Sequence, residues 1–327
     1  MASKAQQLAF MAQNSPIDVL LPPFQPIQPS TAGKVTYQIP VPTNWCYLWW
    51  SLLFSGAAGF NPVTCLQELR VKVNGIILIQ ISGAQLDAIN QYFKYPASTA
   101  TGSATNFVML VPFIRQSMKG MNGWVDFASK QFNTGSIPDI EWETALNCGM
   151  ADPNTGIAIT QVLCEVDIVN TPAGTLSITP QAKVLPASPG GPGPLLFMNK
   201  TTFATINGTN QLTGQNGLLY GDINHSWLEA IFMFPPAGLV DNFQFWLNSQ
   251  EIFQRSQLLN IYYESLNFQR VPPAAAGGAM CAVDFCETGF ADGVKYIAPL
   301  ATAARLQFTE NTAEGLILIQ RSLGYLG

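Results

Sequence analysis

His225 is the only histidine in this chain of 327 residues, so a Ser-His-Asp or Cys-His catalytic device would have to use it. It stands just before an apolar stretch, in a predicted loop at a strand edge. Asp139, Glu141 and Glu143 alternate and would share one face of a strand, where carboxylates can serve a glycosidase or bind calcium. We interpret this alternation as a solvated strand face. The sequence therefore predicts no catalytic residue.

The cysteines offer no metal or disulfide pattern. Six are spread along the chain, mostly beside apolar residues, as buried thiols are: Cys46, Cys65, Cys148, Cys164, Cys281 and Cys286. Cys281 and Cys286 could supply two ligands, but no second pair or nearby histidine completes a zinc site. The sequence also lacks a phosphate-binding loop, a dinucleotide glycine pattern and a metalloprotease helix. We predict no metal and no cofactor.

Three Asn-X-Ser/Thr sequons, at Asn199, Asn207 and Asn224, have no functional meaning unless the chain is secreted. The N-terminus lacks the profile of a signal peptide. The apolar segment 45–54 is about half the length of a spanning helix and is rich in aromatic residues, which favours a strand. We therefore expect a soluble protein that is made in the cytoplasm.

The chain is poor in charge. Charged residues make up 11% of it, whereas apolar residues make up 48%, and the net charge is −5. The 15 lysines and arginines form no cluster, which argues against direct nucleic-acid binding. Because interface cores are depleted of charge, we expect much of the surface to be covered by other copies. The alternative is a surface of uncharged polar side chains.

The elements that would position any site occur twice. Residues 69–75 lead through an apolar run to Gln80 and Ser82, and residues 243–249 lead in the same way to Gln254 and Ser256, 174 positions later. A second echo joins residues 146–161 to residues 306–320. Both echoes run in the same order, which predicts two similar domains rather than a solenoid.

Predicted strands are short and lie between Gly, Pro and Asn clusters. In the first copy we expect strands at 34–39, 45–54, 66–73, 76–81, 107–114, 137–146 and 156–168. In the second copy we expect them at 195–204, 227–234, 243–247, 279–285, 305–308 and 316–320. Ser82 and Gln85 form a capping box that predicts a short helix after them, and a second helix is expected near 257–263.

This pattern predicts an all-β chain of two tandem jelly-roll sandwiches, each with a short helix. We place an N-terminal arm at 1–30, the first jelly roll at 31–184, a Pro/Gly linker at 185–194 and the second jelly roll at 195–327. Five prolines between Pro16 and Pro29 keep the arm extended. We expect the arm to be ordered only by neighbouring subunits or a membrane, and to be dispensable for folding.

The segment from Leu69 to Gly75, followed by Gln80 to Asn90, resembles the N-terminal jelly roll of double-jelly-roll major capsid proteins. These come from tailless, membrane-containing bacterial viruses of the corticovirus and tectivirus kind, and the size and low charge are similar to those of compact members such as the coat protein of flavobacterial lipid-containing phage. The resemblance implies a homotrimer whose six jelly rolls form a pseudo-hexagonal capsomer of an icosahedral virion, above an internal membrane. It implies contacts with neighbouring capsomers, and through the arm with that membrane or with minor capsid proteins. It carries over no catalytic residue.

Two other functions are alternatives: a carbohydrate-binding or carbohydrate-active protein on paired sandwiches, and a viral spike or attachment protein. The first needs a cleft with perturbed carboxylates, for which the sequence offers only the alternation at 139–143. The second favours a fibre-like repeat, which is not present. We therefore favour a structural capsid protein.

Overall fold

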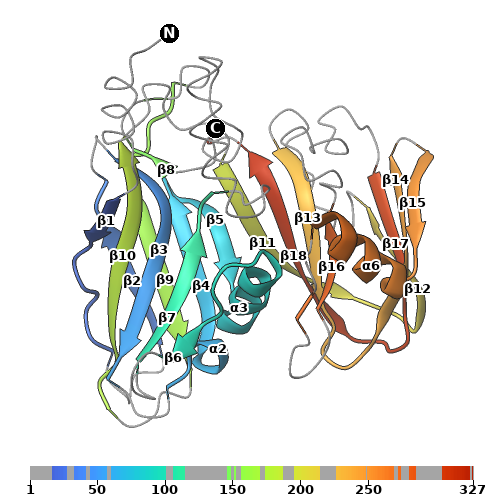
Figure 1. Cartoon of the computed structure of the whole chain (residues 1–327), viewed down its shortest axis with the longest axis horizontal. Coiled ribbons are helices and arrows are strands. Elements are labelled where there is room, and N and C mark those ends of the chain that lie inside the picture. Colours follow the sequence, from blue (N-terminus) through green and yellow to red (C-terminus); the bar gives the residue numbers. More distant parts are fainter. Residues whose placement is uncertain are drawn as a thin grey trace.

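A computed structural model describes residues 17–27, 33–41, 45–56, 60–100, 106–114, 146–148, 151, 156–169, 174–186, 195–213, 226–247, 249–268, 272–273, 280–284, 304–324 and 326. Within these residues the chain forms two β-sandwiches that lie side by side, with one helix between them and another on the second sandwich (Figure 1).

The first sandwich has two sheets. One has the order β1-β10-β3-β7-β6, with β8 paired to β3, and the other contains β5, β4, β9 and β2 in that order. Its elements are β1 (Ile17–Leu20), β2 (Gly33–Ile39), β3 (Trp45–Ser55), α2 (Pro62–Cys65), β4 (Leu66–Val73), β5 (Ile76–Ile81), α3 (Gly83–Tyr92), β6 (Thr99–Ala100), β7 (Asn106–Pro112), β8 (Leu146–Asn147), β9 (Val162–Ile168) and β10 (Ser177–Pro186).

The second sandwich repeats this arrangement. Its sheets have the orders β11-β18-β13-β16 and β15-β14-β17-β12. Its elements are β11 (Leu195–Ala204), β12 (Gly208–Thr213), β13 (Ser226–Phe234), β14 (Val240–Leu247), β15 (Gln250–Arg255), α6 (Gln257–Phe268), β16 (Cys281–Asp284), β17 (Ala304–Glu310) and β18 (Gly315–Gly324). The two units correspond element by element in chain order. The strands match as β1 with β11, β2 with β12, β3 with β13, β4 with β14, β5 with β15, β7 with β16, β9 with β17 and β10 with β18, and the helix α3 matches α6. Both units have jelly-roll topology, and the predicted fold class is confirmed.

The internal duplication is confirmed at the level of single residue pairs. In the β4–β5 hairpin, Arg70 pairs with Gln80 and the register shifts after Val71. In the β14–β15 hairpin, Gln244 pairs with Gln254 and the register shifts after Phe245. Gln244, Phe245 and Gln254 lie 174 residues after Arg70, Val71 and Gln80, respectively. The strand pairing and the bulge are therefore both repeated.

The helix that follows each hairpin also starts in the same way. Ser82 is the N-cap of α3, where its hydroxyl accepts from the Gln85 amide at 3.3 Å and the Gln85 side chain accepts from the Ser82 amide at 3.0 Å. The hydroxyl of Ser256 accepts from the Leu259 amide at 3.3 Å at the start of α6. Both serines satisfy amides that the first helical turn leaves without partners.

The second echo is wrong as an alignment. Residues 156–161 form no strand, whereas residues 315–320 lie in β18. β9, which starts at Val162, corresponds to β17, because β9 pairs with β4 as β17 pairs with β14. Asn74 explains why the segment before β9 leaves the ladder: its Oδ1 accepts from the amides of Thr160 (2.9 Å) and Gln161 (3.2 Å), and its Nδ2 donates to the Ala158 carbonyl (2.7 Å).

Residues 17–27 belong to the first jelly roll, so the expected boundary at residue 31 lies too late. β1 pairs with β10, and the amides of Leu21, Phe24 and Ile27 donate to carbonyls along the same edge. Their side chains are buried in the core. Residues 1–16 and 28–30 lie outside the described residues. The linker also begins later than residue 185, because β10 continues to Pro186, which pairs with Trp45.

A continuous sheet links the two sandwiches. β11 runs parallel to β5 at Met198 and Ile79, so eight strands form one sheet in the order β16-β13-β18-β11-β5-β4-β9-β2. β13 is therefore buried on both faces: Ile231 and Met233 point into the core of the second sandwich, whereas Ala230 and Phe232 pack with the core that continues from the first. Burial on both faces accounts for the unbroken apolar run of this strand.

Candidate functional site

The joint between the two jelly rolls is centred on the end of α3. Tyr92 and the adjacent Phe93 make edge-on ring contacts with Phe232 of β13, at centroid distances of 5.4 and 5.8 Å. The Tyr92 hydroxyl donates to the carboxylate of Glu264 in α6 and lies 3.5 Å from an oxygen of Asp284 in β16. Tyr92, Glu264 and Asp284 are all buried, so this joint combines aromatic packing with polar contacts between the two rolls.

A buried ion pair lies beside this aromatic cluster. Nε of Arg321 in β18 is 2.9 Å from Oε2 of Glu229 in β13, and both side chains are at most 3% exposed. The guanidinium also lies over the Phe93 ring, 3.9 Å from its centroid. A charge this deep requires a partner, because removing one member of a buried pair leaves the other uncompensated. The contact between the two rolls therefore depends on a buried ion pair as well as on aromatic packing.

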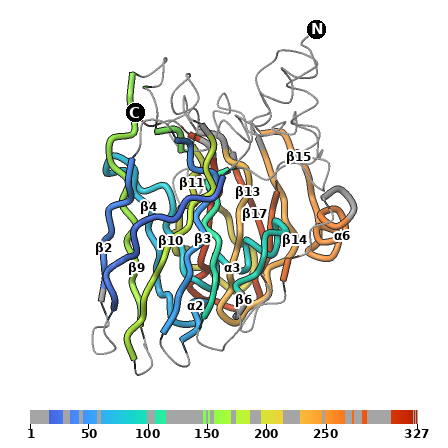
Figure 2. Tube along the Cα trace, turned by 60° about the vertical axis from the view of Figure 1, so that its left-hand side comes forward, coloured from blue at the N-terminus to red at the C-terminus, as the bar shows by residue number. Residues whose placement is uncertain are grey.

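The two equivalent helices differ in what covers them. α3 is almost wholly buried, and it lies between the rolls (Figure 1). α6 lies on the second roll (Figure 1 and Figure 2), where its Glu264 side chain meets Tyr92 of α3. Its apolar side chains Leu258, Leu259, Tyr262 and Tyr263 are 78%, 49%, 59% and 40% exposed.

Three of these four exposed positions on α6 correspond to covered positions on α3. Leu259, Tyr262 and Tyr263 lie 174 residues after Gln85, Ala88 and Ile89, each of which is buried. A contiguous apolar patch of this kind on one helix is typical of a surface that binds another protein. We call these four side chains, Leu258, Leu259, Tyr262 and Tyr263, the α6 patch.

The sheet face that would receive such a helix is also partly exposed in one roll and covered in the other. In the second roll the outer face of β13 and β16 holds Ala230, Phe232 and Ala282, which are buried at the joint. In the first roll the corresponding face of β3 and β7 holds half-buried apolar side chains. We call it the β3–β7 face, defined by Trp49, Leu53, Val108 and Leu110.

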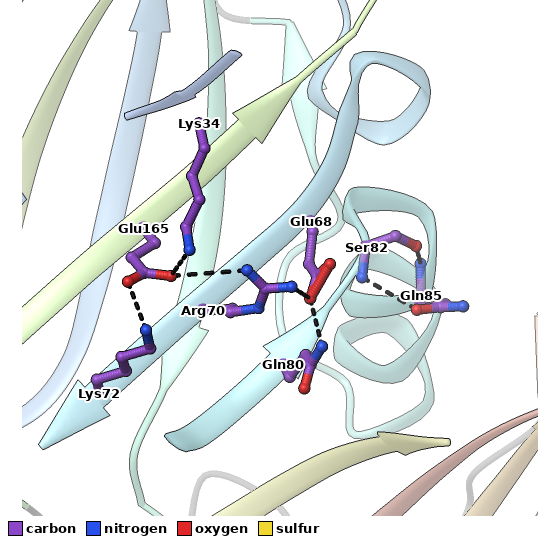
Figure 3. Close-up of polar contacts among 8 residues, drawn as sticks. All are labelled: Lys34, Glu68, Arg70, Lys72, Gln80, Ser82, Gln85 and Glu165. Carbon is purple, nitrogen blue, oxygen red and sulfur yellow. Dashed lines mark hydrogen bonds and ion pairs between the residues drawn. The ribbon is translucent and has the colours of Figure 1, made fainter. Parts of the chain in front are cut away.

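A charged cluster occupies the outer face of the opposite sheet of the first roll (Figure 3). Glu165 of β9 is only 6% exposed, and its carboxylate binds the ammonium groups of Lys34 (2.6 Å) and Lys72 (2.5 Å). Burial alone would raise the pKa of Glu165, but the hydrogen bonds and positive charges of Lys34 and Lys72 outweigh it and lower the pKa below its ordinary value. Arg70 continues the cluster to Glu68 at 2.7 Å. These contacts tie β2, β9 and β4 together and leave no open reactive group.

The sequence-predicted candidates do not converge on a catalytic site. His225, Asp139, Glu141, Glu143, Cys286 and Asn224 lie outside the described residues. Asn199 lies in β11, and Asn207 precedes β12. Across the described ranges, no group of three or more His, Cys, Asp and Glu side chains gathers to hold a metal ion.

The described cysteines are all buried: Cys46, Cys65, Cys148, Cys164 and Cys281. Burial raises the pKa of Cys46, Cys148, Cys164 and Cys281 to about 12, so they stay protonated and weakly nucleophilic at neutral pH. This agrees with the packing role expected from their apolar neighbours. In the part of the chain that the structure describes, no helix is long and apolar enough to span a membrane.

The sequence matches no protein-family model and no curated protein. The whole fold, however, is similar to solved capsid structures. The major capsid protein P2 of bacteriophage PM2 aligns over 95% of this chain and 98% of its own length, with a TM-score of 0.69 and 16% identity. The fold is the double jelly roll of viral major capsid proteins.

Two further solved structures share this double jelly roll. The major capsid protein (MCP) of Sulfolobus turreted icosahedral virus (STIV) aligns over 95% of this chain and 97% of its own length, with a TM-score of 0.57 and 11% identity. The capsid of the virus PBCV-1 covers 96% and 97%, with a TM-score of 0.57 and 10% identity. At such low identity the shared feature is the fold, and the resemblance stated from the residues around the first hairpin is confirmed at that level.

Proposed function

We propose that this chain is a major capsid protein, a structural and non-catalytic subunit of a virion. It assembles as a homotrimer whose six jelly rolls form a pseudo-hexagonal capsomer, and such capsomers build an icosahedral shell around an internal membrane. Its partners are other copies in the trimer, neighbouring capsomers, and, through residues 1–16, that membrane or minor capsid proteins. It is synthesised in the host cytoplasm and binds no nucleic acid directly.

One structural observation supports the proposed trimeric assembly. Within the chain, α3 of the first roll packs on the outer face of β13 and β16 in the second roll. The α6 patch and the β3–β7 face are the two halves of an equivalent contact, and the described residues of one chain leave the patch exposed and the face partly exposed. Because they lie on different rolls, the patch of one copy would meet the β3–β7 face of the next. Such head-to-tail contacts either close into rings or continue as filaments, and three copies close the ring proposed here.

The low charge of the chain supports the same assembly. A surface that other copies cover need not be charged, and only 11% of the residues are charged. The three capsid structures of the same fold make a shell role the natural use of this architecture. Fold alone would not assign it, because sandwiches serve many functions.

The test replaces Tyr262 with Glu on the α6 patch and measures native mass at micromolar concentration. We expect the wild type to be a trimer and the variant to be a folded monomer, because a buried charge without a partner is costly in an interface. Ile206→Asp is the matched control, since Ile206 is 61% exposed and lies outside the patch. A monomeric wild type, or an unchanged trimer in the Tyr262 variant, would contradict this assembly.

A further inference from the structure

The two jelly rolls of the chain are joined along the edges of two sheets. β11 runs parallel to β5 at Met198 and Ile79, so a sheet of the first roll continues into a sheet of the second. The counterparts of these strands, β1 and β15, also end the sheets in which they lie, and no described strand pairs with their outer sides. An edge strand presents a row of amide and carbonyl groups to which another strand can pair.

Repeated registers locate the residue of β15 that corresponds to Ile79. In the β4–β5 hairpin, Ile79 faces Val71, and the register shifts immediately after this pair. In the β14–β15 hairpin, Phe253 faces Phe245, and the register shifts at the same place. Phe253 lies 174 residues after Ile79, as the other repeated positions of these hairpins do. Phe253 is therefore the position of β15 that would face a neighbouring strand.

The residue of β1 that corresponds to Met198 follows from a second pair of registers. Met198 faces Arg321 of β18, and Arg321 lies where the pairing of β18 with β13 shifts register. Asp18 faces Lys183 of β10, and Lys183 lies where the pairing of β10 with β3 shifts register. In both cases the extra residue belongs to the third strand, β13 or β3. The repeated bulge therefore aligns the two edges, and Asp18 occupies the place of Met198.

The backbone of β1 presents suitable groups at this place. The Leu21 amide donates to the Pro180 carbonyl of β10 at 3.1 Å, so the backbone groups of Leu21 point toward β10. In an antiparallel pair, successive residues point their amides and carbonyls alternately toward and away from the partner strand. Counting back from Leu21, the amide and carbonyl of Leu20 and of Asp18 point away from β10. They face the open edge, as a pairing at Asp18 requires.

Charges on the two edges agree with the same register. On β15, the guanidinium of Arg255 lies 4.5 Å from the ring centroid of Phe253 and 4.9 Å from that of Tyr263, a member of the α6 patch. Asp18 contacts Lys183 at 3.0 Å, but its side chain is still 57% exposed, so a second cation can reach the carboxylate. With Phe253 opposite Asp18, Arg255 lies two residues further along the same face. Opposite charges at such neighbouring positions stabilise strand pairing.

We propose that β15 of one copy pairs in parallel with β1 of the next copy, with Phe253 opposite Asp18. The partner at each open edge is thus a second copy of this chain, bound by β-strand addition. The inference rests on the trimer proposed above and specifies its contact: the α6 patch covers the β3–β7 face, and the strand edges beside them join. The outer edges β2 and β12 lack this support, because they correspond to each other and no pairing between the two rolls involves them.

The experiment uses the full-length protein with pairs of cysteines placed across the proposed contact. Directly opposite residues on adjacent strands lie about 4.8 Å apart, within the Cα separation of about 4.4–6.8 Å that a disulfide spans. Asp18→Cys with Phe253→Cys and Val19→Cys with Gln254→Cys are both in register. After mild oxidation of the native protein with oxidised glutathione, we expect each pair to give covalent trimers on a denaturing gel without reductant. Mass spectrometry should identify the linked peptides.

Matched controls move one cysteine along the strand. Leu20→Cys with Phe253→Cys keeps the same cysteine on β15 but separates the Cα atoms by about 8 Å, which is too far for a disulfide. We expect its yield of covalent trimer to be lower by about tenfold or more. The pair at Val19 and Gln254 leaves Phe253 intact, so it tests the register even if the Phe253→Cys variants do not fold. Its own control is Ile17→Cys with Gln254→Cys.

Native mass, measured under reducing conditions before oxidation, separates this inference from the trimer itself. Covalent trimers from the in-register pairs alone support the pairing. A trimeric native mass without these crosslinks, or with equal yields from the control pairs, overturns the pairing and leaves the proposed capsid role standing. A monomeric native mass of the wild type contradicts the trimer and the pairing together.

Discussion

Tyr92, at the end of α3, donates a hydrogen bond from its hydroxyl to the carboxylate of Glu264 in α6, and so joins the first jelly roll to the second. The two residues are 172 positions apart in the chain, and both are buried. The same tyrosine ring packs on Phe232, so one side chain supplies both the polar and the apolar part of the joint.

Replacing Tyr92 with Phe should keep the ring contacts and remove the hydrogen bond to a buried carboxylate. Such a loss lowers the free energy of unfolding by about 1–3 kcal/mol. Urea denaturation would measure this. Tyr262→Phe, at a residue that is 59% exposed, is the control and should change stability by less than about 0.5 kcal/mol. Equal effects of the two substitutions would show that the Tyr92 hydroxyl does not stabilise the joint.

Glu165→Gln should destabilise the first roll by about 1–3 kcal/mol at neutral pH, because the carboxylate accepts charge-assisted bonds from Lys34 and Lys72. The folded-state pKa is lowered, so this stabilisation is complete above the ordinary pKa of about 4.3 and is lost as the pH falls through the lowered value.

Chemical denaturation from neutral to acidic pH would therefore show the two proteins converging in acid. Asp18→Asn breaks an ion pair whose carboxylate is 57% exposed and should change little at any pH. A gap between wild type and Glu165→Gln that does not change with pH would disprove the linkage.

Deletion of residues 1–27 should unfold the first roll or lower its stability by more than about 4 kcal/mol, because it removes β1 and the buried side chains of Leu21, Phe24 and Ile27. Deletion of residues 1–16 is the control and should leave the melting temperature nearly unchanged. This reverses the expectation that the N-terminal arm is dispensable for folding. Thermal denaturation of both truncated proteins would test this. Equal melting temperatures would show that residues 17–27 are not needed for folding.

Asn74 combines a backbone and a side-chain role that two substitutions can separate. Its φ is 50° and that of Gly75 is 84°, as the two central residues of a tight hairpin turn require. Asn74→Gly keeps that freedom but loses the bonds to residues 158–161, whereas Asn74→Ala loses both. We expect losses of about 1–2 and 2–3 kcal/mol, respectively. Equal losses, measured by thermal denaturation, would show that the backbone conformation contributes nothing.

Local patterns in the sequence predicted most of the hairpins and the helices α3 and α6, but not the short helix α2. The Asn74-Gly75 turn and the capping serines have mechanisms that act within a few residues, so the sequence reveals them directly. Strands whose residues violate the usual pattern were missed. β10 contains Pro180 and Pro186, and β12 is mostly polar, so neither has the alternation of a typical strand.

The joint could not be predicted, because nothing near Tyr92 in the chain indicates which distant carboxylate its hydroxyl meets. The repeat at a fixed offset was the only long-range signal, and it located equivalent elements without showing that one helix is covered and the other is not.

The strand pairing between Ile79 and Met198 has a mechanical consequence. A single sheet runs from one roll into the next, and α3 is packed against it, so the two halves of the chain cannot hinge without breaking backbone hydrogen bonds and the buried joint. The two rolls of one chain should therefore move as a single rigid body. In a curved shell built from such chains, the change of angle would occur at the interfaces between copies.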